Sequence, residues 1–140
     1  MAFPLVTATY AAILGLILAA LSVWVVATRL RTGVLHGDGR QDTLGRRMRA
    51  HANFTEYVPM ILILIALLEM MRSNLYLITT LLVILVIARL MHPFGMLAPV
   101  NSMQQYIFRG LPAVATLGVL IVAAVTLLMR CLSVPYGLHG

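Results

Sequence analysis

The chain has 140 residues, of which 61% are hydrophobic and only 10% are charged, and its net charge is +6. Soluble domains carry about 25% charged residues, so a chain this poor in charge cannot cover a water-facing surface and must have lipid as the solvent for much of it. The basic residues are all arginines and form no patch on a soluble domain, which excludes a nucleic-acid-binding domain. Arginine-rich loops beside an anionic membrane surface explain the charge instead.

Three long apolar runs predict helices over about residues 4–30, 75–93 and 108–132. About 20 apolar residues are needed to cross a bilayer as a helix, and these runs approach or exceed that length. Pro93 has no N–H to donate to the carbonyl of Arg89, so the third helix is expected to bend or stop there. The segment from His92 to Arg109, which is rich in proline, glycine and polar residues, is expected to form a loop.

The remaining apolar run, Val58 to Met71, has only 14 residues and is too short to span a membrane alone. Its helix must therefore start earlier, near Leu44 or Arg46, and is predicted over about residues 44–71. The expected fold is an all-α integral membrane protein with a single domain over residues 1–140, built as a bundle of four transmembrane helices.

Arginine is distributed unequally between the two ends of this bundle. Six arginines lie between Arg29 and Arg49, and Arg89 and Arg109 border the third connection, whereas the opposite end has only Arg72 and Arg130. The positive-inside rule then places the first and third connections in the cytoplasm and both termini in the periplasm.

Arg49, Asn53 and Glu56 have the spacing i, i+4 and i+7, which places them on one face of the second helix, with the hydroxyl of Tyr57 on the neighbouring face. Ionisable groups at membrane depth cost about 2.5–3.5 kcal/mol each, so they are expected to face protein or trapped water. One interpretation is structural, with Glu56 pairing with Arg49 or Arg89 to hold helices together.

A second polar cluster, Arg89 and His92, lies in the last turn of the third helix and at the same end of the bundle. Together with Arg49 and Arg109 it gives an excess of arginine over the single carboxylate of Glu56. Because the guanidinium matches carboxylates in a bidentate geometry, this excess predicts an anion-binding site. Glu69 lies about 20 Å further along the second helix and is expected to pair with Arg72 at the surface. No set of residues has the spacing of a metal site.

The run Arg49-Ala-His-Ala-Asn53-Phe-Thr-Glu56-Tyr57-Val-Pro59 resembles the signature of the MAPEG family, the membrane-associated proteins in eicosanoid and glutathione metabolism. The segment Ala88-Arg89-Leu-Met-His92 is similar to the second motif of that family. The resemblance covers the whole chain in length, helix count and orientation, and it is strongest to the bacterial branch that resembles microsomal glutathione transferases.

This resemblance implies a homotrimer in a bacterial inner membrane that binds glutathione, its co-substrate, between subunits at the cytoplasmic end. The residues that match glutathione-binding positions of one subunit are Arg49, Asn53, Glu56, Tyr57, Arg89 and His92. A neighbouring subunit is expected to contribute Arg29 or Arg31, and His51. Arg109 is the expected catalytic residue, with Arg29 or Arg31 as substitutes, because an arginine near the start of the fourth helix stabilises the glutathione thiolate in the family.

The implied activity is that of a glutathione transferase or peroxidase acting on hydrophobic electrophiles or lipid hydroperoxides. A non-catalytic protein that binds glutathione or another small anion is the alternative, since Met96 occupies a position where several family members carry a tyrosine. A small multidrug exporter is disfavoured because the first helix has no carboxylate. A proton or ion pathway is disfavoured because Glu69 is too far from Glu56 to continue a relay.

Overall fold

The computed structural model describes residues 3–133, in which the regular secondary structure is helical and no strand occurs. Four of its helices are long and apolar enough to cross a membrane, the fourth being a continuous helical stretch over Met103–Ser133. The elements are α1 (Leu5–Thr32), α2 (Asp42–Met70), α3 (Leu75–Leu97), α4 (Met103–Gln105), the π-helical segment η1 (Tyr106–Gly110) and α5 (Leu111–Ser133). The expected all-α membrane fold with four spanning helices is confirmed.

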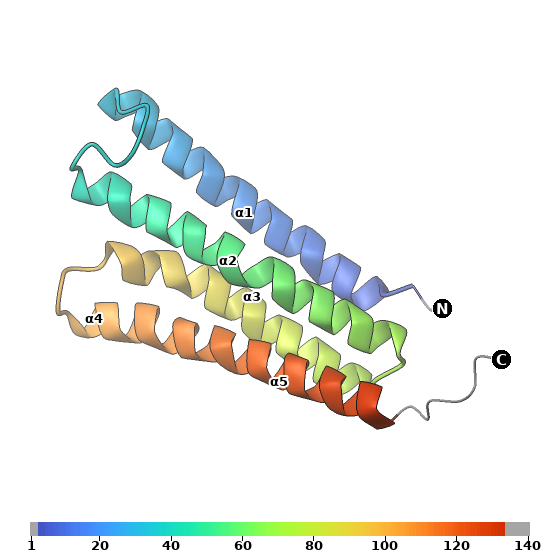
Figure 1. Ribbon diagram of the computed structural model, residues 1–140. Helices are drawn as coiled ribbons and strands as arrows, with labels where there is room; N and C mark the ends of the chain where they lie inside the picture. Colours follow the sequence, from blue (N-terminus) through green and yellow to red (C-terminus); the bar gives the residue numbers. More distant parts are fainter. Residues whose placement is uncertain (1–2, 134–140) are drawn as a thin grey trace.

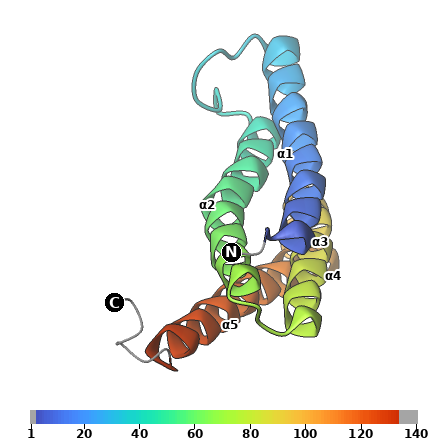
Figure 2. The same cartoon turned by 90° about the vertical axis from the view of Figure 1, so that its right-hand side faces the viewer.

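The helices run up and down, with the α1–α2 and α3–α4 connections at one end and the α2–α3 connection, the start of α1 and the end of α5 at the other (Figure 1). We call the first the connection end and the second the terminal end. In the described part of the chain α2 and α3 each contact all the other long helices, whereas α1 and α5 do not touch (Figure 2). The core between them is apolar and includes Leu14, Phe54, Ile61, Ile65, Leu82, Leu85 and Val119.

Helix ends follow local chemistry. Gly33 ends α1 in a left-handed conformation with φ of 68°, which glycine adopts without a steric penalty. The side chain of Asn74 accepts a hydrogen bond of 2.8 Å from the backbone N–H of Tyr76 and so caps the start of α3. Ser102 caps α4 in the same way, accepting from the N–H of Gln105 at 3.1 Å.

The expectation that α2 begins well before its apolar run is confirmed, because the helix starts at Asp42. The expectation of a loop from His92 to Arg109 is wrong. Helix α3 continues through Pro93 to Leu97, and the fourth spanning helix starts at Met103 rather than near residue 108. Proline removes one backbone hydrogen bond, and membrane helices tolerate this loss where neighbouring elements support the turn.

That support comes from a close approach between α3 and η1. A Cβ atom added at Gly95 would collide with the backbone of Phe108 and Arg109, so only glycine allows this contact. The last turns of α3 are thus held against the π-helical segment, which carries Arg109. π-Helical turns inside longer helices occur frequently at functional sites.

The predicted ion pair between Glu69 and Arg72 is also wrong. The Glu69 carboxylate accepts hydrogen bonds from the backbone N–H groups of Val6 and Thr7, at 2.9 and 2.8 Å, and from the Thr7 hydroxyl at 2.6 Å. It therefore caps the first turn of α1, whose N-cap residue Pro4 offers no side-chain cap. A carboxylate at a helix N-terminus also interacts favourably with the helix dipole.

Candidate functional site

The charged residues of the Arg49–Asn53–Glu56 stripe face out of the protomer. Arg49 and Glu56 are exposed, whereas Asn53 and Tyr57 are half-buried at the edge of the bundle. Within residues 3–133 the only ion pair joins Arg46 to Asp42, so neither Arg49 nor Glu56 has an ionic partner there. The structural interpretation, in which Glu56 pairs with Arg49 or Arg89, is therefore not supported within one protomer.

The position of Glu56 along α2 makes this exposure costly. Glu56 is 14 residues before the last residue of α2, Met70, and at 1.5 Å per residue this is about 21 Å. A hydrocarbon core about 30 Å thick that begins at Met70 therefore still surrounds Glu56 and ends near Arg49. An exposed carboxylate at that depth requires a polar environment from outside the protomer.

Arg89, from α3, is the most deeply buried charged residue, with 2% of its surface exposed. Its Nη1 donates to the backbone carbonyl of Asn53 at 3.3 Å, and its Nη2 donates to the hydroxyl of Thr116 in α5. The Thr116 hydroxyl in turn donates to the carbonyl of Pro112 at 2.7 Å. Arg89 therefore joins α2, α3 and α5 through neutral groups.

A cavity of about 70 Å³ adjoins Arg89 between α2, α3 and α5. Its lining consists of Asn53, Tyr57, Arg89, Ala113, Thr116 and Leu117. Two members of the predicted glutathione-binding set, Asn53 and Tyr57, are thus brought together with a third, Arg89. A separate apolar groove of about 370 Å³ runs between α1 and α3, where Trp24 and Phe94 form part of its wall.

His92 and Arg109 lie beyond Arg89 toward the connection end. His92 is buried, with 3% of its surface exposed, and Arg109 is exposed in the last turn of η1. Since α3 packs closely on η1 through Gly95, both residues belong to the same corner of the bundle. This corner therefore brings the guanidinium groups of Arg89 and Arg109 to the same side of the bundle as the imidazole of His92.

Two other members of the predicted set have structural contacts inside the protomer. Arg29 donates from Nη1 to the carbonyls of Val34, Leu35 and Gly37, at 3.2, 3.1 and 3.0 Å, and so organises the α1–α2 connection. His51 lies 3.0 Å from the hydroxyl of Ser22 through its Nε2. Of the two candidates at the end of α1, only Arg31 is exposed and free of such contacts in the described chain.

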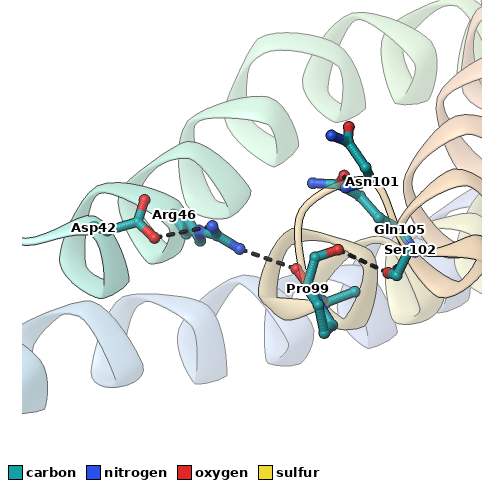
Figure 3. A network of polar contacts seen from close by, with 7 residues as sticks. Asp42, Arg46, Pro99, Asn101, Ser102 and Gln105 are labelled. Atoms are coloured by element: carbon teal, nitrogen blue, oxygen red, sulfur yellow. Dashed lines mark hydrogen bonds and ion pairs between the residues drawn. The ribbon is translucent and has the colours of Figure 1, made fainter.

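Arg47 and Arg46 also stabilise the connection end. The guanidinium of Arg47 lies 4.6 Å from the ring centroid of Trp24 and donates to the hydroxyl of Thr28. Arg46 pairs with Asp42 at 2.9 Å and donates to the carbonyl of Ala98 at 3.0 Å, which fastens the α3–α4 connection to the start of α2 (Figure 3).

Sequence reasoning missed Thr116 and Gly95. Thr116 is one hydroxyl within an apolar run, and threonine is common in membrane helices, so nothing marks it as the acceptor for Arg89. Gly95 lies in the segment predicted to form a loop, where the absence of a side chain predicts no close contact with another element. Both roles depend on contacts between elements that are distant in the sequence.

Comparison with known proteins agrees with this architecture. The family model described as "MAPEG family" matches residues 7–129. The chain is 33% identical over 91 residues, 65% of this chain and 70% of the relative, to "Inner membrane protein YecN" from two strains of Escherichia coli. No solved structure matches. With four candidate spans and an inner-membrane relative, the chain is a multi-pass inner membrane protein, and the match over most of its length shows that it belongs to the MAPEG family.

Proposed function

We propose that the protein is a membrane-bound glutathione transferase or peroxidase whose site is completed by neighbouring copies in a homotrimer. The observation that carries the proposal is the exposure of Arg49 and Glu56 on a membrane helix without an ionic partner in residues 3–133. Opposite charges on one helix face suit a zwitterionic ligand with excess negative charge. The second copy supplies the cover that this face lacks.

Glutathione has two carboxylates and one ammonium group, and the site offers matching groups. Arg49, together with Arg31 from the neighbouring copy, provides guanidinium groups for the carboxylates, and Glu56 provides a carboxylate for the ammonium. Asn53 and Tyr57, at the edge of the cavity, supply neutral hydrogen-bonding groups. Arg29 is the weaker candidate for this role because it already bonds three carbonyls of its own connection.

Activation of the thiol is assigned to Arg109. A free thiol has a pKa near 8.5, and lowering that pKa to about 6.5 requires roughly 2.7 kcal/mol of preferential thiolate stabilisation. One arginine in a low-dielectric cleft is sufficient for a shift of this size. The thiolate then attacks a hydrophobic electrophile and displaces its leaving group. With a lipid hydroperoxide it attacks the terminal oxygen and breaks the O–O bond, which releases the lipid alcohol and leaves a glutathione sulfenic acid that a second glutathione converts to the disulfide and water.

The proposed topology has both termini in the periplasm and the site in the cytoplasmic half of the membrane. Its support is the arginine excess at the connection end, which holds Arg31, Arg40, Arg46 and Arg49 among others, against Arg72 and Arg130 at the terminal end. Glutathione is then drawn from the cytoplasm. The apolar co-substrate enters from the bilayer.

The test is calorimetric titration of glutathione into the purified protein. Arg49→Ala and Glu56→Gln each remove a charged hydrogen bond, so the affinity is expected to fall by about 10-fold to 100-fold. Arg130→Ala, an exposed arginine at the terminal end, is the matched control and should bind like the wild type. Unchanged binding in both site variants would remove the assigned site.

The alternative, a protein that binds glutathione without catalysis, is favoured by Met96 in place of the tyrosine found in several family members. Turnover of 1-chloro-2,4-dinitrobenzene and of an organic hydroperoxide with glutathione separates the two functions. Ultraviolet titration of bound thiolate in the wild type and Arg109→Ala tests the activating residue. Equal thiolate formation in both proteins would exclude Arg109 from this role.

A further inference from the structure

The charge of Arg89 has no counter-charge inside the protomer. No carboxylate of residues 3–133 lies within 4.0 Å of its guanidinium, whose hydrogen bonds in this range go to the Asn53 carbonyl and the Thr116 hydroxyl. Its Nε atom is buried and has no hydrogen-bond partner there. A buried charge without compensation is strongly unfavourable, and arginine does not escape by losing its proton.

The cavity beside Arg89 has the size and lining for a counter-ion. A volume of about 70 Å³ exceeds the roughly 10–15 Å³ that a single water needs by this measure. Asn53 and Tyr57, whose side chains carry an amide and a hydroxyl, line the cavity, and within the described residues neither side chain has a hydrogen-bond partner. The Asn53 amide and the Tyr57 hydroxyl can each donate a hydrogen bond to an anion.

We propose that this cavity between α2, α3 and α5 binds one small monovalent anion, of the size of chloride or a carboxylate group, as the counter-ion of Arg89. The Thr116 proton is already donated to Pro112, so the donors to the anion are Arg89, Asn53 and Tyr57. The surrounding walls, formed by Ala113 and Leu117, are apolar and strengthen each of these interactions.

The proposal does not depend on the glutathione function. An inorganic anion from the cell and a carboxylate of a larger ligand present the same chemistry to Arg89. If glutathione fails to bind at all, the counter-ion requirement of Arg89 is unchanged, because that requirement follows from burial within one protomer.

The first experiment measures the thermal unfolding midpoint of the purified protein while sodium chloride replaces sodium gluconate at constant ionic strength. Gluconate is too large for the cavity, so chloride is expected to raise the midpoint in a saturable manner, as a ligand specific for the folded state does. Arg89→Met should abolish this dependence. Arg130→Met, the same change at an exposed position of α5, should retain it.

A second variant keeps the test valid if Arg89→Met does not fold. Tyr57→Phe removes one hydroxyl and little volume, and it should weaken the apparent chloride affinity by about 10-fold. A crystal grown with bromide should show an anomalous peak beside Arg89. Loss of the peak when glutathione is added identifies a glutathione carboxylate as the natural occupant, and its retention identifies a resident inorganic ion. A midpoint independent of chloride, with no bromide peak, would overturn the proposal.

Discussion

The two ends of the bundle satisfy their charged groups in different ways. At the terminal end the carboxylate of Glu69 accepts three hydrogen bonds from the first turn of α1. At the connection end Arg29, Arg46 and Arg47 are likewise bonded inside the protomer, but Arg49 and Glu56 are exposed without an ionic partner in residues 3–133. Arg89 is buried there beside a cavity.

Charged residues with partners inside the protomer stabilise its fold, whereas charged residues without such partners are free to bind a ligand or a neighbouring copy. Buried or membrane-depth charges are retained only where they are compensated. Glu69 is compensated locally and has a structural role, whereas Glu56 and Arg49 are not. The charge excess alone therefore does not define the site, since three of the arginines at the connection end already have structural partners.

The largest expected effect on stability comes from disrupting the contact between α3 and η1 at Gly95, at the connection end. Gly95→Ala places a Cβ atom against the backbone of Phe108 and Arg109, which has no side-chain freedom to relieve the contact. We expect a loss of about 3 kcal/mol in the free energy of unfolding, measured as a lower thermal midpoint in detergent. Gly118→Ala, where no atom lies within 4 Å, is the control and should lose nothing.

The next effect is expected at the terminal end. Glu69→Ala removes all three acceptor contacts with α1 and should cost about 2 kcal/mol, the value of a charged helix cap. Thr7→Val removes only the hydroxyl contact and should cost about half as much. Thermal unfolding measures both, and equal stabilities of the two variants would show that the backbone contacts of Glu69 contribute nothing.

A smaller effect is expected for the fastening of the α3–α4 connection. Arg46→Ala loses the hydrogen bond to the Ala98 carbonyl and should cost about 1 kcal/mol. Asp42→Asn removes the ion pair with Arg46 and a negative charge from the first turn of α2. Because the Asp42 side chain is 79% exposed, this change should cost about 0.5 kcal/mol. Hydrogen exchange at residues 98–102 should be faster in Arg46→Ala than in Asp42→Asn or the wild type. Equal exchange rates in all three proteins would contradict the role of Arg46 in holding this connection.

The sequence predicted an element of the fold correctly where one physical constraint, such as the length needed to span a bilayer, determined it. The apolar run after Tyr57 is too short to span a bilayer, and that constraint placed the start of α2 before Arg49. The prediction that α3 ends at Pro93 was wrong. The free-energy cost of one lost backbone hydrogen bond is small compared with the stabilisation from the contact between Gly95 and η1. That contact joins segments whose pairing is not visible in local periodicity.

In the candidate site, the sequence predicted which side chains share one face of α2 but not the hydrogen bonds of Arg89. Spacing on α2 placed Arg49, Asn53 and Glu56 on one helix face, as found. The partners of Arg89 lie 36 and 27 residues away in the chain, and no local rule connects them. For Glu69 the local rule favoured Arg72, but three hydrogen bonds at a helix N-terminus outweigh one surface ion pair, which contributes about 0–1 kcal/mol.

The smallest effect on stability is expected for the residues with the largest expected effect on ligand binding. Arg49→Ala and Glu56→Gln remove exposed side chains without ionic partners in the described protomer, so neither should lower the free energy of unfolding by more than about 0.5 kcal/mol. Native mass spectrometry should show the same fraction of the proposed trimer as in the wild type. Loss of the trimer in either variant would assign these residues to assembly, because a binding role alone leaves the contacts between copies intact.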